Sequence, residues 1–298
     1  MKMPSRPIQG ILWMISTGLC FIAVTAIVKY AAQDLPAAEA AFLRYLLGLV
    51  FLLPIARTLL ATRISSRDLK FFAARGLVHT LAVILWFYAM TQIPIAEVTA
   101  MNYLNPVYVT LGAAIFLGET LALRRILAVV AALLGVVVIL RPGFREIETG
   151  HLAMLATAAL FGASYLFAKP LSGRYSATMV VAMLSVTVTV GLAPFAFAVW
   201  RTPTVADLGW MFLVAAFATA GHYTMTRAFA AAPISVTQPV TFLQMVWAVL
   251  LGWAFFAEPP DGFVILGALI IIASVSFIAW REARLKRGVT PPHVATKH

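Results

Sequence analysis

The sequence predicts an all-α integral membrane protein with ten transmembrane helices, arranged as two inverted five-helix repeats with both termini in the cytoplasm. Three observations support this prediction: the composition, ten apolar stretches separated by short polar breaks, and a correspondence between the two halves. Apolar residues make up 62% of the 298 residues and charged residues only 11%, whereas soluble domains have about 45–50% and about 25%. The mean hydropathy is +0.94. Apolar sequence this abundant and this evenly spread indicates many membrane crossings.

Ten stretches are long enough to cross the hydrocarbon core, which takes roughly 20 residues in an α-helix. Backbone polar groups find no water in lipid, so the stretches must be helices. They also lack the alternation of apolar and polar residues that membrane β-strands show. The predicted helices cover residues 8–30, 37–59, 70–90, 95–117, 122–140, 151–169, 177–200, 206–228, 233–256 and 262–281.

The breaks between these stretches carry residues that typically begin or end helices. In chain order they are Asp34-Leu35-Pro36, Ser65-Ser66 with Asp68, Pro94, Arg141-Pro142-Gly143, Pro233 and Pro259-Pro260-Asp261-Gly262. A serine caps the third helix by accepting a hydrogen bond from its backbone. A proline opens the fourth and the ninth helix, where a missing N–H costs little.

The Lys and Arg residues at the helix ends predict the orientation. With the N-terminus inside, sixteen of them fall on the inner side, and only Lys29, Arg141, Arg145 and Arg201 fall on the outer side. Inner loops of membrane proteins carry this excess of positive charge. The net charge of +11 is therefore interpreted as topology and attraction to anionic lipid headgroups, and nucleic acid is not expected as a partner.

The two halves match at a nearly constant spacing. At an offset of 139 or 140 residues the matched pairs are Gly10 and Gly150, Lys29 and Lys169, Pro94 and Pro233, Asn105 and Gln244, and Glu119 and Glu258. Five helices per half is an odd number, so the halves would enter the membrane from opposite sides, as in many secondary transporters. The alternative is chance matching between apolar sequences. We predict repeats at 1–143 and 144–282, followed by a basic, disordered cytoplasmic tail at 283–298.

Several segments resemble a known family. They are Phe42-Leu43-Arg44-Tyr45-Leu46-Leu47-Gly48, Pro94 through Glu119, Pro233 through Glu258, and Gly267-Ala268-Leu269-Ile270. With the ten helices, they are similar to the EamA branch of the drug/metabolite transporter superfamily, and most of all to its YddG-type exporters of aromatic amino acids. The resemblance implies export of small metabolites across the inner membrane by alternating access. Four-helix multidrug relatives bind cations with a carboxylate in the first helix, but residues 8–30 contain no acid.

Other classes of protein have little support in the sequence. No phosphate-binding motif of the form G-x-x-x-x-G-K-[ST] is present, and neither is a zinc-protease or nucleophile-elbow motif. The chain has one cysteine, Cys20, so neither a disulfide within the chain nor a cysteine metal cluster is expected. We predict no enzyme activity, no cofactor and no metal. A membrane-embedded enzyme is the alternative from a different class.

Polar and aromatic residues near the helix centres are the candidate substrate-binding residues, because polar groups at this depth are costly. They are His79, Trp86, Asn102, Tyr103, Asn105, Tyr165, His222 and Gln244. Packing or interhelical hydrogen bonding could account for each of them instead. We expect the site near the membrane midplane, between the third, fourth, eighth and ninth helices, with contributions from the first and sixth.

The predicted function is a secondary exporter of aromatic or neutral amino acids, with another metabolite or a drug as the alternative substrate. A lining of amides, hydroxyls and rings with few fixed charges suits a zwitterion better than a phosphorylated sugar, which needs clustered Lys or Arg. The charged residues nearby are given structural roles. Arg44 is expected to bind backbone carbonyls, and Glu119 and Glu258 to fix loops. Lys29 and Lys169 are expected to extend to the membrane interfaces.

Overall fold

The computed structural model of this chain describes residues 6–117, 122–232, 237 and 240–288. The regular secondary structure in these ranges is helical. The helices are α1 (Pro7–Ala31), α2 (Ala37–Gly48), the 3₁₀ helix η1 (Leu49–Ile55), α3 (Ala56–Ala61), α4 (Ser66–Gln92), α5 (Ile95–Asn102), α6 (Asn105–Leu117), α7 (Leu123–Leu140), α8 (Thr149–Ser172), α9 (Ala177–Ala198), α10 (Val205–Ala231), α12 (Leu243–Phe256) and α13 (Gly262–Gly288).

Eight helical stretches within the described residues are long and apolar enough to cross a membrane. They correspond to eight of the ten predicted helices, with α2, η1 and most of α3 forming one stretch, Ala37–Leu59. The predicted all-helical, multi-pass character is thereby confirmed. The predicted ninth helix is described as α12, which has only 14 residues. Pro233 and Glu119 lie outside the described residues, so the full count of ten stays a prediction.

The predicted fourth helix, 95–117, is not continuous. It is divided into α5 and α6 at Tyr103 and Leu104, whose N–H groups donate to carbonyls only three residues back. Proline lacks an N–H and clashes with the carbonyl four residues earlier. Pro106 therefore cannot hydrogen-bond the carbonyl of Asn102, and Asn102 is the residue at which α5 ends.

A second correction concerns the tail. Helix α13 continues to Gly288, because residues 281–287 are mostly good helix formers.

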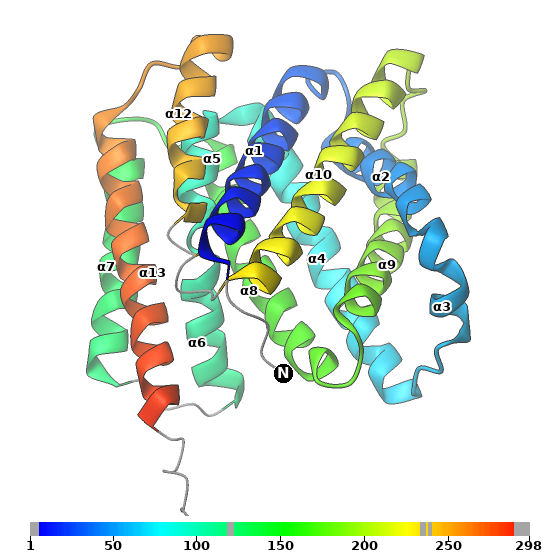
Figure 1. Ribbon diagram of the computed structural model, residues 1–298. Coiled ribbons are helices and arrows are strands. Elements are labelled where there is room, and N and C mark those ends of the chain that lie inside the picture. The colour runs from blue at the N-terminus through cyan, green and yellow to red at the C-terminus, as the bar shows by residue number, and fades with distance from the viewer. Residues whose placement is uncertain (1–5, 118–121, 233–236, 238–239, 289–298) are drawn as a thin grey trace, which may run out of the picture.

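Helices of the two halves interleave. The most extensive packing pairs α4 with α8, α1 with α10, and α7 with α13. Each pair joins one helix from either half, and each is antiparallel. In Figure 1, α7 and α13 form one edge, α2, α3 and α9 form the other, and α1 and α10 cross in front of α4 and α8. Gly135 and Gly267 bring α7 and α13 close together, since a Cβ on Gly267 would lie 2.5 Å from the Gly135 carbonyl oxygen.

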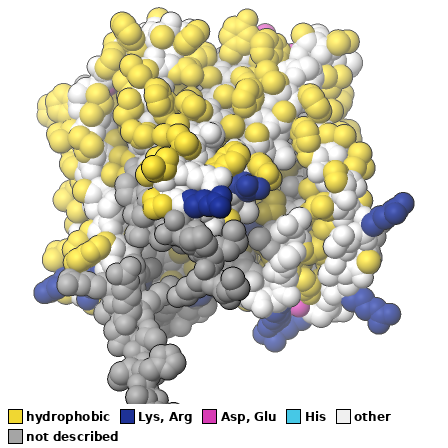
Figure 2. All heavy atoms as spheres, viewed as in Figure 1, with side chains coloured by type: hydrophobic (Ala, Val, Ile, Leu, Met, Phe, Trp, Pro, Cys, Tyr) yellow, Lys and Arg dark blue, Asp and Glu magenta, His cyan; other side chains and the backbone are white. Residues whose placement is uncertain are grey.

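The bundle has two ends. We call the upper one in Figure 1 the network end, where residues 29–35, 92–97, 141–151, 199–204 and 257–262 meet. The opposite end holds the contact between Asp68 and Arg174. Large hydrophobic side chains are exposed along most helices. On the face shown in Figure 2, Lys and Arg side chains gather toward the lower part.

Candidate functional site

A central cavity brings most of the predicted site residues together. It has a volume of about 260 Å³ and is lined by residues of α1, α2, α4, α8 and α10, by the α5–α6 break and by the start of α12. The predicted residues that line it are His79, Trp86, Asn102, Asn105, Tyr165, His222 and Gln244. Tyr165 lies at its margin, since 48% of this residue is exposed.

Tyr103 is the predicted residue that does not line the cavity. Its ring packs edge-on against Phe242, with 5.5 Å between the centroids, and its hydroxyl donates to the Thr241 carbonyl at 3.4 Å. The prediction assumed one continuous helix over residues 95–117. The structure breaks this helix at Tyr103 and Leu104, and Tyr103 contacts Phe242 and Thr241 instead of the cavity.

Phe161 of α8 also lines the cavity, where it packs against two residues of α4. It was not among the predicted site residues. The His79 ring lies 4.8 Å from the Phe161 ring, and the Trp86 ring lies edge-on 6.1 Å away. His79 Nδ1 also hydrogen-bonds the Ser164 hydroxyl at 3.0 Å. Phe161 is four residues before Tyr165, and residues with this spacing share a helix face. That spacing is the signal that could have identified it.

The α5–α6 break supplies amide groups. Asn105 donates to the Asn102 side-chain oxygen at 3.1 Å. The side-chain oxygen of Asn105 is buried and has no hydrogen-bond partner among the residues that the structure describes. Across the cavity, the His222 ring packs edge-on against Phe21, with 5.2 Å between the centroids. The site thus combines aromatic faces with amides, one of which has an acceptor that no described residue occupies.

Arg44 of α2 also lines the cavity. Its guanidinium lies 3.9 Å from the centre of the Tyr45 ring. The expected hydrogen bonds to backbone carbonyls are not found for Arg44 within the described residues. Arg75, whose Nη1 donates to the Val180 carbonyl at 3.0 Å, fits that structural role instead. No carboxylate from the described part of the chain lines this cavity.

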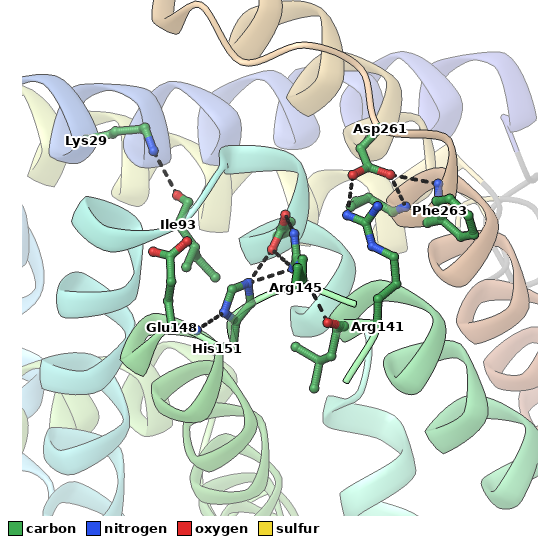
Figure 3. A network of polar contacts seen from close by, with 11 residues as sticks. Lys29, Ile93, Arg141, Arg145, Glu148, His151, Asp261 and Phe263 are labelled. Atoms are coloured by element: carbon green, nitrogen blue, oxygen red, sulfur yellow. Dashed lines mark hydrogen bonds and ion pairs between the residues drawn. The ribbon is translucent and has the colours of Figure 1, made fainter. Parts of the chain in front are cut away.

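A network of charged residues lies at the network end (Figure 3). Lys29 Nζ lies 2.7 Å from Glu258 Oε1 and donates to the Ile93 carbonyl at 2.8 Å. The other Glu258 oxygen accepts from the Ile95 N–H at 2.9 Å. Glu258 therefore does fix a loop, as expected. Lys29 was expected to extend to the membrane interface, but its side chain is only 14% exposed in this ion pair.

Glu97 is the most buried carboxylate of this network, with a side chain that is 3% exposed. It accepts two hydrogen bonds from Arg145, both at 2.8 Å. His151 Nδ1 accepts from the Glu148 N–H, so its Nε2 carries the proton and donates to Glu97 at 2.5 Å. The 2.9 Å approach of Arg145 Nη2 to this nitrogen is then a contact between two donors. The hydrogen bonds to Glu97 raise the pKa of the Arg145 guanidinium above its ordinary value.

The same end contains a more exposed ion pair, between Arg141 and Asp261. Burial acts to raise the pKa of the Asp261 carboxyl. The N–H groups of Phe263 and Val264 and the Arg141 guanidinium outweigh this effect and hold the pKa below its usual value. These charges surround a second cavity of about 580 Å³. Each charged side chain that lines it has an oppositely charged partner, so the central cavity is the better candidate for a substrate site.

Comparison with known proteins identifies the class and the family. The apolar helices, together with the relatives of this chain, show that the protein is a multi-pass transporter of the cell inner membrane. The profile of the EamA-like transporter family matches residues 8–141 and again residues 148–280, so the chain belongs to this family.

Three relatives span nearly the whole chain. A riboflavin transporter of Rhizobium johnstonii is 34% identical over 95% of both chains. A pseudopaline exporter of Pseudomonas aeruginosa is 25% identical over 94% of this chain and 98% of its own. An S-adenosylmethionine uptake transporter of Rickettsia conorii is 24% identical over 93% of this chain and 94% of its own. These relatives support a transporter of small metabolites. They do not support the predicted likeness to aromatic amino acid exporters, and they include both uptake and export.

Proposed function

We propose that this protein is a secondary transporter of a small heteroaromatic metabolite of the riboflavin class, which crosses the membrane by alternating access. The observation that carries the proposal is the lining of the central cavity, where aromatic rings, three amides and a guanidinium occur together with no carboxylate from the described residues. Riboflavin combines a flat tricyclic ring, an imide edge and a hydroxylated chain, and each part has a matching group in this cavity.

The rings of Trp86 and Phe161 supply apolar faces against which a flat ring can pack. Such aromatic contacts contribute about 0.5–1.5 kcal/mol per pair beyond burial. Asn102, Asn105 and Gln244 can both donate and accept hydrogen bonds. An imide edge and hydroxyl groups need both, and each such bond contributes about 0.5–1.5 kcal/mol net. The 34% identity to a riboflavin transporter along nearly the whole chain supports the same substrate class.

The predicted amino acid substrate suits this lining less well. Its ammonium group would leave water for a cavity that offers a guanidinium and no carboxylate within the described residues. A charged group that loses water without gaining an opposite charge is strongly disfavoured. The amino acids Phe and Trp are therefore compared with riboflavin in the transport experiment below.

Purified protein in liposomes tests the substrate. Radiolabelled riboflavin should equilibrate across the membrane unmodified, whereas labelled Phe and Trp should enter no faster than into protein-free liposomes. Chromatography of the recovered label addresses the alternative of a membrane-embedded enzyme, which would convert the substrate. Transport of Phe or Trp without riboflavin would refute the proposed substrate class.

We also propose the predicted topology of ten spans in two inverted repeats, with both termini cytoplasmic. If the halves are equivalent, α1 corresponds to α8, α4 to α10 and α7 to α13. The packed pair α1·α10 then corresponds to the packed pair α8·α4, and the pair α7·α13 corresponds to itself. This symmetry of the packing supports a pseudo-two-fold relation. In a Cys20→Ser background, Thr62→Cys should react with a membrane-impermeant maleimide only in inverted vesicles. Phe144→Cys, at a residue that is 93% exposed, should react in intact cells. The reverse pattern would refute the orientation.

A further inference from the structure

The charges of the central cavity differ from those elsewhere in the bundle. At the network end, Lys29, Glu97 and Arg141 each have an oppositely charged partner. Near the cavity, the described residues contribute two guanidinium groups, Arg44 and Arg75, and no carboxylate. An ionised side chain at membrane depth is expensive unless it is paired or has a function.

Arg75 has a structural explanation for its position. It is 6% exposed, and it donates to the backbone carbonyl of Val180 on α9, so it links α4 to α9. Arg44 has no comparable bond. Within the described residues, its one direct polar contact is the face of the neighbouring Tyr45 ring. Contact with a ring face leaves the edge of the guanidinium, with its five N–H donors, free to bind another group.

The surroundings of Arg44 define what those donors can bind. It lines the cavity together with His79 and His222. An imidazole supplies no negative charge. A guanidinium forms its strongest contacts with planar groups that present two acceptor atoms, such as carboxylates and the acceptor edges of heterocycles. It repels cations.

We propose that Arg44 is the specificity-determining residue of the cavity, and that it selects aromatic substrates with an anionic or double-acceptor edge and rejects aromatic cations. This inference rests on the proposed transport function and makes its substrate class narrower. The ring of the substrate lies against the aromatic side chains, and its acceptor edge faces the guanidinium. A substrate with a fixed positive charge meets the Arg44 guanidinium in this cavity and no carboxylate from the described residues.

A matched pair of ligands tests this selection without use of riboflavin. 3-Phenylpropionate and 3-phenylpropylamine have the same ring and chain but opposite charges at neutral pH. Isothermal titration calorimetry on the purified protein should show binding of the anion at least tenfold tighter than binding of the amine. Arg44→Gln should abolish this preference. Arg44→Lys should keep a reduced preference, because it retains the charge but loses the planar fork.

Arg57→Gln is the matched control, because Arg57 is exposed and lies on the same predicted span outside the cavity. It should keep the preference of the parent protein. Riboflavin is then titrated into the same variants, and Arg44→Gln should weaken its binding at least tenfold. Monodisperse elution and an unchanged melting temperature confirm that each variant is folded.

The possible failures are distinguishable. If the anion binds in a manner that depends on Arg44 while riboflavin is neither bound nor transported, the riboflavin proposal fails and the role of Arg44 stands. The role of Arg44 is overturned if the parent protein shows no preference for the anion, or if Arg44→Gln keeps the preference. Equal losses in Arg44→Gln and Arg57→Gln would also overturn it.

Discussion

Two arginines of the loop between α7 and α8 form ion pairs, and we predict that their replacement by alanine lowers the free energy of unfolding by very different amounts. Arg145→Ala removes the partner of Glu97, and Arg141→Ala removes the partner of Asp261. The two arginines are almost equally exposed, at 25% and 23%. The two acids are not, since Glu97 is 3% exposed and Asp261 is 31% exposed. The comparison therefore isolates the burial of the carboxylate that loses its partner.

Burial sets the expected magnitudes. Loss of one partner from a buried ion pair costs about 3–5 kcal/mol, because the remaining charge is left buried without compensation. Glu97 keeps its hydrogen bond from His151, so we expect the lower end of this range for Arg145→Ala. An exposed pair contributes about 1 kcal/mol or less, which is the expectation for Arg141→Ala. At about 2–4 °C per kcal/mol, the melting temperature should fall by roughly 6 °C or more in Arg145→Ala and by at most about 4 °C in Arg141→Ala.

Melting temperatures in detergent, read from intrinsic tryptophan fluorescence at one fixed heating rate, provide the assay. The double variant Glu97→Gln/Arg145→Ala adds a second check. A neutral amide leaves no unpaired charge, so the double variant should recover part of the stability that Arg145→Ala loses. Equal falls for the two single variants would refute the reasoning, and so would a double variant less stable than Arg145→Ala.

Two further predictions concern packing and binding. Gly267→Ala should destabilise the protein by about 1–3 kcal/mol, because the new methyl group overlaps the Gly135 carbonyl and overpacking costs this much. Gly209→Ala, where a Cβ meets nothing within 4 Å, should be neutral or stabilising, and equal melting temperatures would contradict the packing argument. Trp86→Ala should weaken riboflavin affinity several-fold to about tenfold, since about 1.4 kcal/mol is a factor of ten. Trp253→Ala, at a residue that is 61% exposed, should leave the affinity measured by titration unchanged.

The helices were largely predictable because lipid requires continuous apolar segments, and hydropathy reports these directly. The break in the fourth helix was harder to place. Pro106 lies inside this stretch, but where the helix breaks depends on how the chain repacks around the freed carbonyls. One helix was therefore predicted where the structure has two, α5 and α6.

Partners distant in sequence were not predictable from a single sequence. Glu97 meets Arg145, and Lys29 meets Glu258, and nothing local indicates either pairing. Arg44 was visible as a charge in an apolar helix, but its lack of an oppositely charged partner among the described residues is a property of the folded structure. The relatives do not support the predicted amino acid substrate. The segments that carry the family resemblance include residues that line the cavity, such as Arg44, Asn105 and Gln244, but a likeness in these segments identified the fold and not the molecule that the cavity binds.

The ion pair between Lys29 and Glu258 has a consequence for synthesis of the protein in the cell. The two residues are 229 positions apart (258 minus 29). At translation rates of about 5–20 residues per second, Lys29 enters the membrane roughly 10 to 45 s before its partner exists. Throughout that interval its ammonium group must be held by water and lipid headgroups at the membrane surface. The ion pair that joins Lys29 to Glu258 therefore forms only when nearly the whole chain has been made.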